Sequence, residues 1–151
     1  MLLRVLHESI AARTGAIERS HGSWPCRKGC DACCTRLAAV PELTAAEWDL
    51  LRPVAEALPA HVHARIEALE GAVRPVACPF LEAGACLVYE ARPVACRTYG
   101  FYVDRDGGQY CGLVEALNAD VIWGNGAAVE AELSALGTRR DLLTLWRSGS
   151  D

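Results

Sequence analysis

The chain has 151 residues, of which 52% are hydrophobic and 23% charged, and its formal net charge is −4. That length is typical of a single domain with a genuine core, and the acidic balance argues against a nucleic-acid-binding module, which normally carries a basic surface. Eight residues are cysteine, which is too few for a small disulfide scaffold but more than core packing requires.

The N-terminal segment carries no recognisable targeting signal. Arg4, His7 and Glu8 interrupt any apolar run there, so we expect no signal-peptide core. No stretch of the sequence approaches the roughly 18 apolar residues of a membrane span. We therefore expect a cytoplasmic protein with neither a membrane nor a nucleic acid as partner. In a reducing cytosol, cysteines more often bind metals or catalyse reactions than form disulfides.

A helix is predicted at the N-terminus, followed by a break before the first cysteines. Apolar side chains recur at helical spacing over residues 1–20, at Leu3, Leu6, Ile10 and Ile17. Gly22 and Pro25 then interrupt the helical pattern. Residues 37–41 look extended.

Two further helices are predicted next. Thr44 and Glu47 form a capping box that starts the first of them, and Pro53 is expected to kink or divide it. Pro59 begins the other helix. Its apolar positions are Val62, Ile66, Leu69 and Val73.

The middle of the chain has a different character, because its segments are short and interrupted by proline and glycine. Residues 76–81 and 86–89 fit two short strands around a turn at Glu82-Ala83-Gly84. Residues 99–103 fit a further extended segment, and Asp106-Gly107-Gly108 is a turn signal. Helical patterns return over residues 113–147, where Gly137 ends one helix and Asp141 caps the next.

The expected fold is mostly α, with a small irregular cysteine-rich middle that leaves room for a short β-hairpin. We expect one metal-stabilised domain over residues 1–151. Trp48, Trp123 and Trp146 fall on helical segments and are expected in the core.

The cysteines form two groups of four: Cys26, Cys30, Cys33 and Cys34, then Cys78, Cys86, Cys96 and Cys111. Thiolates select zinc, iron–sulfur clusters or Cu(I) over hard cations, and the two-residue gap between Cys30 and Cys33 is usual for ligands of one metal. Adjacent Cys33 and Cys34 rarely bind the same atom. They suggest two metals, a polynuclear cluster, or one ligand beside a supporting thiol. Packing alone explains a single buried cysteine, but not four within nine residues.

Two known cluster signatures fit poorly. The spacing of two-cluster ferredoxins does not occur in this chain. Cys26-x3-Cys30-x2-Cys33 is similar to the motif of radical S-adenosylmethionine enzymes, but those enzymes carry a larger barrel domain, and barrels need roughly 200 residues or more. Ala32 also stands where those enzymes usually have an aromatic residue.

The order of the motifs resembles the CxxCxxCC (YkgJ-like) cysteine-cluster family. The matching stretches are Cys26-Arg-Lys-Gly-Cys30-Asp-Ala-Cys33-Cys34, Cys78-Pro-Phe-Leu81, Cys86-Leu-Val-Tyr89, Arg92-Pro93-Val-Ala-Cys96-Arg97 and the later Cys111. One departure is the three-residue gap after Cys26, where the family has two. The resemblance covers residues 24–112, the expected metal-binding region between helices over 1–20 and 113–147. It implies chelation of zinc or iron by cysteine. A similar cluster occurs in flagellin lysine methylases, and some members are called iron–sulfur oxidoreductases.

Two arginines and three histidines lie near these motifs. Arg92 and Arg97 are expected to donate hydrogen bonds to the metal-binding sulfurs and lower their pKa, although they also fit as ordinary surface arginines. His21 is a candidate ligand or a solvated loop residue. His61 and His63 are predicted to lie on the surface. The sequence contains no phosphate-binding loop, dinucleotide motif or hydrolase motif.

The leading interpretation is a metal-binding protein that uses all eight cysteines. Its cofactor is Zn²⁺ or Fe, either mononuclear or as a [4Fe–4S] cluster, and the sequence does not choose between them. An iron–sulfur oxidoreductase or a thiol-based redox enzyme using Cys33 and Cys34 is the alternative, and metal trafficking or storage is a further one. Whether the chain catalyses a reaction stays open, as do its protein partner and oligomeric state.

Overall fold

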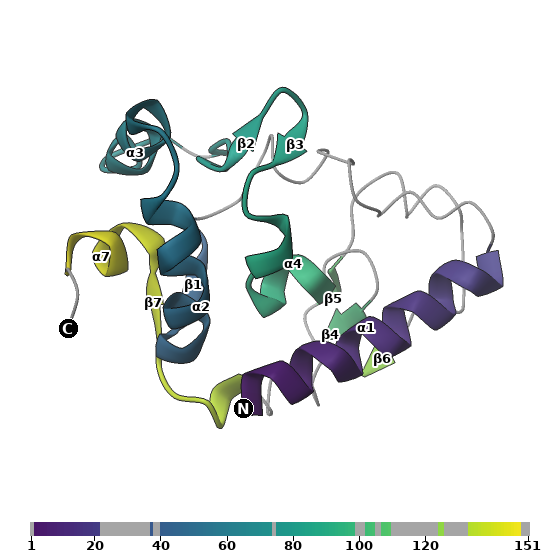
Figure 1. Cartoon of the computed structure of the whole chain (residues 1–151). Helices are drawn as coiled ribbons and strands as arrows, with labels where there is room; N and C mark the ends of the chain where they lie inside the picture. Colours follow the sequence, from purple (N-terminus) through teal and green to yellow (C-terminus); the bar gives the residue numbers. More distant parts are fainter. Residues whose placement is uncertain are drawn as a thin grey trace. The chain divides into compact units, whose positions relative to one another are not determined.

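A computed structural model describes residues 2–21, 37, 40–73, 75–98, 102–104, 107–109, 124–125 and 133–148. The chain divides into two compact units. One consists of residues 1–27 and 93–136, and the other of residues 28–92 and 137–151. We call these the first and the second unit and describe each by itself. Figure 1 labels their helices and strands.

The first unit contains a long N-terminal helix, a short helix and a small sheet. Its elements are α1 (Leu2–His21), α4 (Val94–Thr98), β4 (Tyr102–Asp104), β5 (Gly107–Gln109) and β6 (Gly124–Asn125). One face of α1 is buried through Leu3, Leu6 and Ile10, and α4 contacts this helix. Strand β4 lies between β5, which is antiparallel to it, and β6, which is parallel. Gly107 and Gly108, expected in a turn, instead lie in β5.

The second unit begins with a strand that leads directly into a capped helix. Its elements are β1 (Glu42–Thr44), α2 (Ala45–Glu56), α3 (Ala60–Glu67), β2 (Leu81–Glu82), β3 (Ala85–Cys86), the 3-10 helix η1 (Tyr89–Ala91), β7 (Arg139–Asp141) and α7 (Leu142–Arg147). The predicted capping box is present: Thr44 Oγ1 accepts from the Glu47 N–H at 3.3 Å, and the Glu47 carboxylate accepts from the Thr44 N–H at 3.0 Å. Both residues are buried, so this cap fixes the start of α2 inside the unit.

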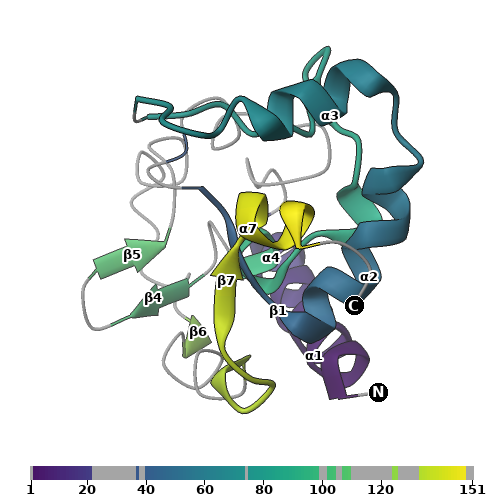
Figure 2. The same cartoon turned by 90° about the vertical axis from the view of Figure 1, so that its left-hand side faces the viewer.

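The C-terminal strand and helix repeat this arrangement. Strand β7 pairs antiparallel with β1, and its last residue, Asp141, caps α7 by accepting a hydrogen bond from the Thr144 N–H at 2.9 Å. Figure 2 shows β1 and β7 side by side, with α7 following β7. Each strand of this two-stranded sheet therefore ends in the residue that starts a helix.

Pro53 does not divide helix α2, and helix α3 is shorter than predicted. Helix α2 continues through Pro53 to Glu56, because Pro53 is exposed and water can satisfy the carbonyl that its missing N–H leaves open. Helix α3 ends at Glu67, and Gly71 follows with a positive φ of 67°, which is typical of a helix end. Val73 therefore lies beyond the helix and is 88% exposed, not on its apolar face.

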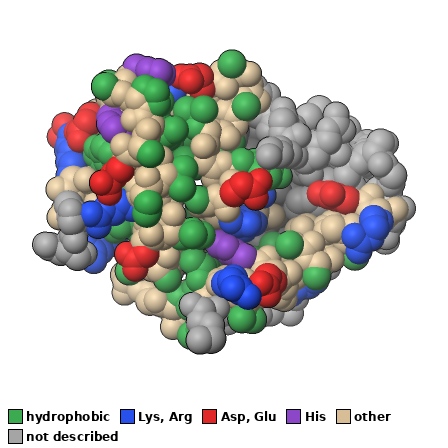
Figure 3. All heavy atoms as spheres, viewed as in Figure 1, with side chains coloured by type: hydrophobic (Ala, Val, Ile, Leu, Met, Phe, Trp, Pro, Cys, Tyr) green, Lys and Arg blue, Asp and Glu red, His purple; other side chains and the backbone are tan. Residues whose placement is uncertain are grey.

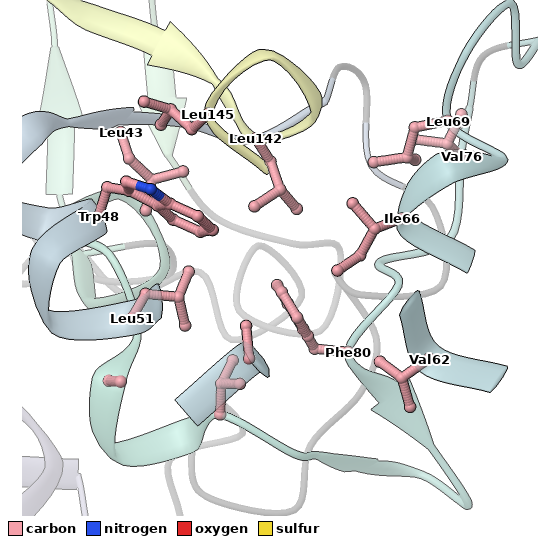
Figure 4. Packing of buried hydrophobic residues seen from close by; sticks show 13 residues of the cluster. Leu43, Trp48, Leu51, Val62, Ile66, Leu69, Val76, Phe80, Leu142 and Leu145 are labelled. Carbon is pink, nitrogen blue, oxygen red and sulfur yellow. The ribbon is translucent and has the colours of Figure 1, made fainter. Parts of the chain in front are cut away.

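One apolar core joins all the helices of the second unit. Its thirteen buried residues are Leu43, Trp48, Leu51, Ala55, Val62, Ile66, Leu69, Val76, Phe80, Val88, Ala91, Leu142 and Leu145, and Figure 4 shows their side chains converging from α2, α3, α7 and the β2–β3 region. Trp48 is buried, as predicted, and Trp146 packs partly buried against the cluster with its ring 6.5 Å from that of Trp48. Trp123 lies outside the described residues.

The fold matches the expected class: the described chain is mostly helical and carries a short antiparallel hairpin, β2–β3. None of its described helices combines the length and the apolar content needed to cross a membrane.

Candidate metal centre

The structure describes three of the eight cysteines that were predicted as metal ligands. Cys78 and Cys86 are half-buried in the second unit, and Cys96 is exposed in the first. The other five cysteines lie outside the described residues: Cys26, Cys30, Cys33, Cys34 and Cys111. The side chain of His21 is not described either. The centre can therefore be built upward from Cys78 and Cys86.

Cys78 occupies the first position of a tight turn. Its carbonyl accepts a hydrogen bond from the Leu81 N–H at 3.1 Å, and Pro79 takes the second position, where its fixed φ suits a β-turn. Phe80 in the third position is only 4% exposed and belongs to the core. The turn is therefore held by the preset backbone angle of Pro79 and by the buried ring of Phe80, two residues after the cysteine.

Cys86 lies on the returning strand of the hairpin. Strands β2 and β3 pair Leu81 with Cys86 and Glu82 with Ala85. The two turn residues, Ala83 and Gly84, both have positive φ, 51° and 77°, as a two-residue hairpin of type I′ requires. The turn lies where the sequence predicted it.

The strands are shorter than predicted. Val76, expected to begin the first strand, forms an isolated bridge with Leu37 instead. Tyr89, expected to end the second strand, begins η1. The turn that starts at Cys78 explains the difference, because a strand cannot run straight through a β-turn centred on Pro79.

Leu81 connects the two cysteines. Leu81 pairs with Cys86 across the two strands, and the Leu81 N–H donates a hydrogen bond to the Cys78 carbonyl. A β-turn holds its end Cα atoms within about 7 Å of each other, and a cross-strand pair holds them about 5 Å apart. Cys78 and Cys86 both pack against the same core. The backbone thus links Cys78 and Cys86 over a short distance, and thiolates are ligands that zinc and iron–sulfur clusters prefer.

Helix α3 is bonded to the tip of this hairpin. The carboxylate oxygen Oε1 of Glu82 lies 2.6 Å from His61 Nε2 and 3.1 Å from an Arg65 amino group. Because an ionised carboxylate only accepts, His61 Nε2 carries the proton. These contacts hold the pKa of the Glu82 carboxyl below its ordinary value, chiefly through the hydrogen bond from His61. In the space-filling view, histidine, acidic and basic side chains lie together over α3 (Figure 3).

Tyr89 and Arg92 of the matching motif contact each other. The Arg92 guanidinium lies 3.7 Å from the centre of the Tyr89 ring, and its Nε donates to the Tyr89 carbonyl at 2.9 Å. The arginine thereby closes the turn of η1, a helix that begins three residues after Cys86. Its expected hydrogen bond to a metal-binding sulfur stays a prediction.

Cys96 and Arg97 lie on α4 in the first unit. The backbone N–H groups of both residues donate to the Pro93 carbonyl, at 3.0 Å and 3.2 Å. Pro93 thus starts the helix that carries Cys96, one of the two roles that a proline before this cysteine can have.

Across the described parts of the chain, no three His, Cys, Asp or Glu side chains gather in a way that could hold a metal ion. Cys78 and Cys86 would therefore need ligands from elsewhere in the sequence. The donor chemistry fits such a site, because cysteine thiolates bind both zinc and iron–sulfur clusters.

Sequence reasoning missed two features of this region. His63, predicted on the surface, is half-buried: its ring lies 4.8 Å from that of Trp146, and its Nε2 is 2.9 Å from the Ala55 carbonyl. Its place beside Val62 and Ile66 on the helix was the available signal. The contacts of Glu82 with α3 were also missed, although His61 and Arg65 have the i,i+4 spacing of neighbours on one helix face.

Comparison with known proteins agrees with the motifs. The sequence model of the CxxCxxCC family, described as a "putative zinc- or iron-chelating domain", matches residues 25–116. That range covers more than half of the chain and contains all eight cysteines. Neither the curated proteins nor the solved structures give a match. The chain therefore belongs to the CxxCxxCC family.

Proposed function

We propose that this protein binds zinc or iron through cysteine thiolates, and that Cys78 and Cys86 are two ligands of one metal. The observation that carries the proposal is the Cys78–Leu81–Cys86 connection, in which one turn and one strand pair tie the two residues together. Membership of a zinc- or iron-chelating family supports the choice of metal.

The remaining ligands come from the other cysteines in the family match: Cys26, Cys30, Cys33, Cys34, Cys96 and Cys111. Eight thiolates suffice for two closed zinc sites of four sulfurs each. They also suffice for one [4Fe–4S] cluster with spare thiols, which suits the adjacent pair Cys33 and Cys34. Arg92 and Arg97 would offset the negative charge of either site.

Bound metal would stabilise the middle of the chain. The strands of the β2–β3 hairpin have two residues each, and an isolated hairpin is marginal in water. Thiolate–metal bonds supply folding free energy to segments of this kind. We accordingly propose that bound metal stabilises the domain. We also propose that the protein is located in the cytoplasm, where thiols stay reduced.

Two alternatives use the same cysteines. An iron–sulfur oxidoreductase or thiol-based redox enzyme is favoured by the adjacent Cys33 and Cys34, because a disulfide between neighbouring residues would be strained and therefore easily reduced. Metal trafficking or storage is favoured by the exposed Cys96, because an accessible ligand allows transfer to a partner.

Metal analysis of protein purified without oxygen and without added metal tests the proposal. About two zinc per chain with a featureless visible spectrum would support two closed sites. Several iron with matching sulfide and a broad visible absorbance would support a cluster. Protein that contains neither metal and binds neither after reduction would contradict the proposal.

A further inference from the structure

The hairpin that carries Cys86 needs support from outside itself. It has two cross-strand pairs, and its turn places Ala83 at a φ of 51°, a left-handed conformation that is unfavourable for a residue with a Cβ atom. Hairpins of this size are unstable alone. The position of Cys86 must therefore depend on what holds the hairpin at its base and at its tip.

The core holds the base. Phe80 before β2 and Val88 after β3 are each 4% exposed and belong to the core. Between them, the Leu87 N–H donates to the Phe80 carbonyl at 2.9 Å. Cys78 lies two residues before the buried Phe80, whereas Cys86 is separated from the turn by one cross-strand pair. Support at the tip should therefore matter more for Cys86 than for Cys78.

Helix α3 contacts the tip through the Glu82 carboxylate. Glu82 is the last residue of β2, and its Oε1 receives hydrogen bonds from His61 at 2.6 Å and Arg65 at 3.1 Å. The helix is itself anchored, because Val62 and Ile66 on its neighbouring face are fully buried in the core. Charged partners make such hydrogen bonds stronger than those between neutral groups. Glu82 thus connects the end of the hairpin to a helix that is anchored in the core.

Glu82 is not placed to be a ligand alongside Cys86. It pairs across the strands with Ala85, whereas Cys86 pairs with Leu81. Because successive side chains of a strand point to opposite faces, Glu82 and Cys86 lie on opposite faces of the hairpin. One face is bonded to α3, and the other carries the cysteine.

We propose that Glu82 is a positioning residue, whose hydrogen bonds with His61 and Arg65 hold Cys86 in a fixed place relative to Cys78 before a metal arrives. Preorganised ligands bind more tightly, because less ordering remains to be done on binding. The inference rests on the proposed function, since it assumes that Cys78 and Cys86 bind a metal. It adds that the ion-paired Glu82 carboxylate raises the affinity of these two cysteines for the metal.

The test compares Glu82→Ala and Glu82→Gln with the parent, using the full chain. In reduced, metal-free protein, the rates at which iodoacetamide labels Cys86 and Cys78 are measured separately by mass spectrometry of peptides. The affinity for Zn²⁺ is measured by competition with a chelator. Glu70→Ala is the matched control, because Glu70 is ion-paired with Arg147 at 3.0 Å on α7 and not with the hairpin.

For Glu82→Ala we expect Cys86 to be labelled about three- to tenfold faster and Zn²⁺ to bind weaker by a similar factor, as the loss of two surface ion-paired contacts allows. Labelling of Cys78 should change less than twofold, and Glu70→Ala should match the parent. For Glu82→Gln, the labelling rate of Cys86 and the affinity for Zn²⁺ should both lie between those of the parent and of Glu82→Ala, because glutamine keeps an acceptor oxygen but loses the charge.

Three results would overturn the inference. Equally faster labelling of Cys78 and Cys86 in Glu82→Ala would indicate general loosening of the fold. Faster labelling of Cys86 with unchanged Zn²⁺ affinity would show that the hydrogen bonds order the hairpin without affecting metal binding. Unchanged labelling of Cys86 would show that they do not order it.

Failure of the proposed function gives different results. In that case the parent would bind no metal, or Cys86→Ser would bind metal as well as the parent, and the inference would fail together with the proposed function.

Discussion

The Arg92 guanidinium lies over the ring of Tyr89, 3.7 Å from its centre, and also donates to the Tyr89 carbonyl. The tyrosine and the arginine of the family's motif are therefore structural partners in one turn. This contact fixes the chain directly after the hairpin that carries Cys86, where Ala91 and Val88 enter the core.

Removing this contact should loosen the turn. We expect Arg92→Ala to lower the free energy of unfolding by about 1 kcal/mol, the contribution of a partly exposed cation–π pair together with a hydrogen bond. Arg92→Lys should lose less, because it keeps the charge over the ring but loses the Nε donor. Urea denaturation of the metal-free protein measures both variants. An Arg92→Ala variant as stable as the parent would contradict this role.

The buried capping box should contribute more than the cap at the surface. Thr44 and Glu47 are 0% and 2% exposed, so Thr44→Ala removes a cap and leaves a buried carboxylate with fewer donors. We expect a loss of about 2 kcal/mol, at the upper end for helix caps. Thr44→Ser should retain most of the stability, and Asp141→Ala, at the exposed cap of α7, should lose about 1 kcal/mol. Thermal unfolding that ranks the two caps in the reverse order would contradict the prediction.

The turn of the hairpin can be improved. Ala83 has a φ of 51°, which asparagine and glycine tolerate better than alanine. We expect Ala83→Asn to raise the free energy of unfolding by about 0.5 kcal/mol, and Gly84→Ala to lower it by about 1 kcal/mol. Chemical denaturation of the two variants should therefore shift the midpoint in opposite directions. Equal shifts in the same direction would be inconsistent with this turn.

Acid should weaken the contact between the hairpin and α3. The hydrogen bond from His61 lowers the pKa of Glu82 below its ordinary 4.5. A carboxyl group with a lowered pKa in the folded state stabilises the fold above the pKa of the unfolded chain, and this stabilisation is lost as the pH falls through the folded value. Stability of the metal-free protein should therefore decline below about pH 4.5.

Glu70 and Asp141 contribute to the same decline, because Arg147 and the Thr144 N–H, respectively, lower their pKa values. In Glu82→Gln the decline should be shallower than in the parent, since one of the three groups no longer titrates. Denaturation curves measured between pH 3 and pH 7 give the slopes. Identical slopes for the parent and Glu82→Gln would show that the Glu82 carboxylate does not stabilise the fold.

Local signals in the sequence account for much of this fold. The capping box at Thr44, the burial of Trp48 and the turn at Ala83-Gly84 each follow from a few neighbouring residues, and the structure has all three. Features that depend on distant partners were missed or misplaced. Val76 pairs with Leu37 rather than extending the hairpin, and His63 is half-buried because Trp146, from the other end of the sequence, packs on it.

In the candidate site, too, features of neighbouring residues could be predicted, whereas contacts between distant residues could not. Spacing and motif order identify the cysteines and the family, because they are properties of short segments. Which cysteines share a metal depends on contacts between segments far apart in the sequence, and spacing carries no information about these. The structure supplies one such relation, through the hydrogen bond and strand pair at Leu81. The expectation of a single domain over residues 1–151 stays a prediction.

Whether Cys78 and Cys86 bind the same metal can be decided from the metal content of single and double variants. Metal per chain is measured by mass spectrometry for the parent, Cys78→Ser, Cys86→Ser and the double variant, all purified without oxygen. If both residues bind one metal, each single variant should lose that metal and the double variant should lose no more than either single one. Losses that add in the double variant, or single variants that retain the full metal content, would contradict the claim.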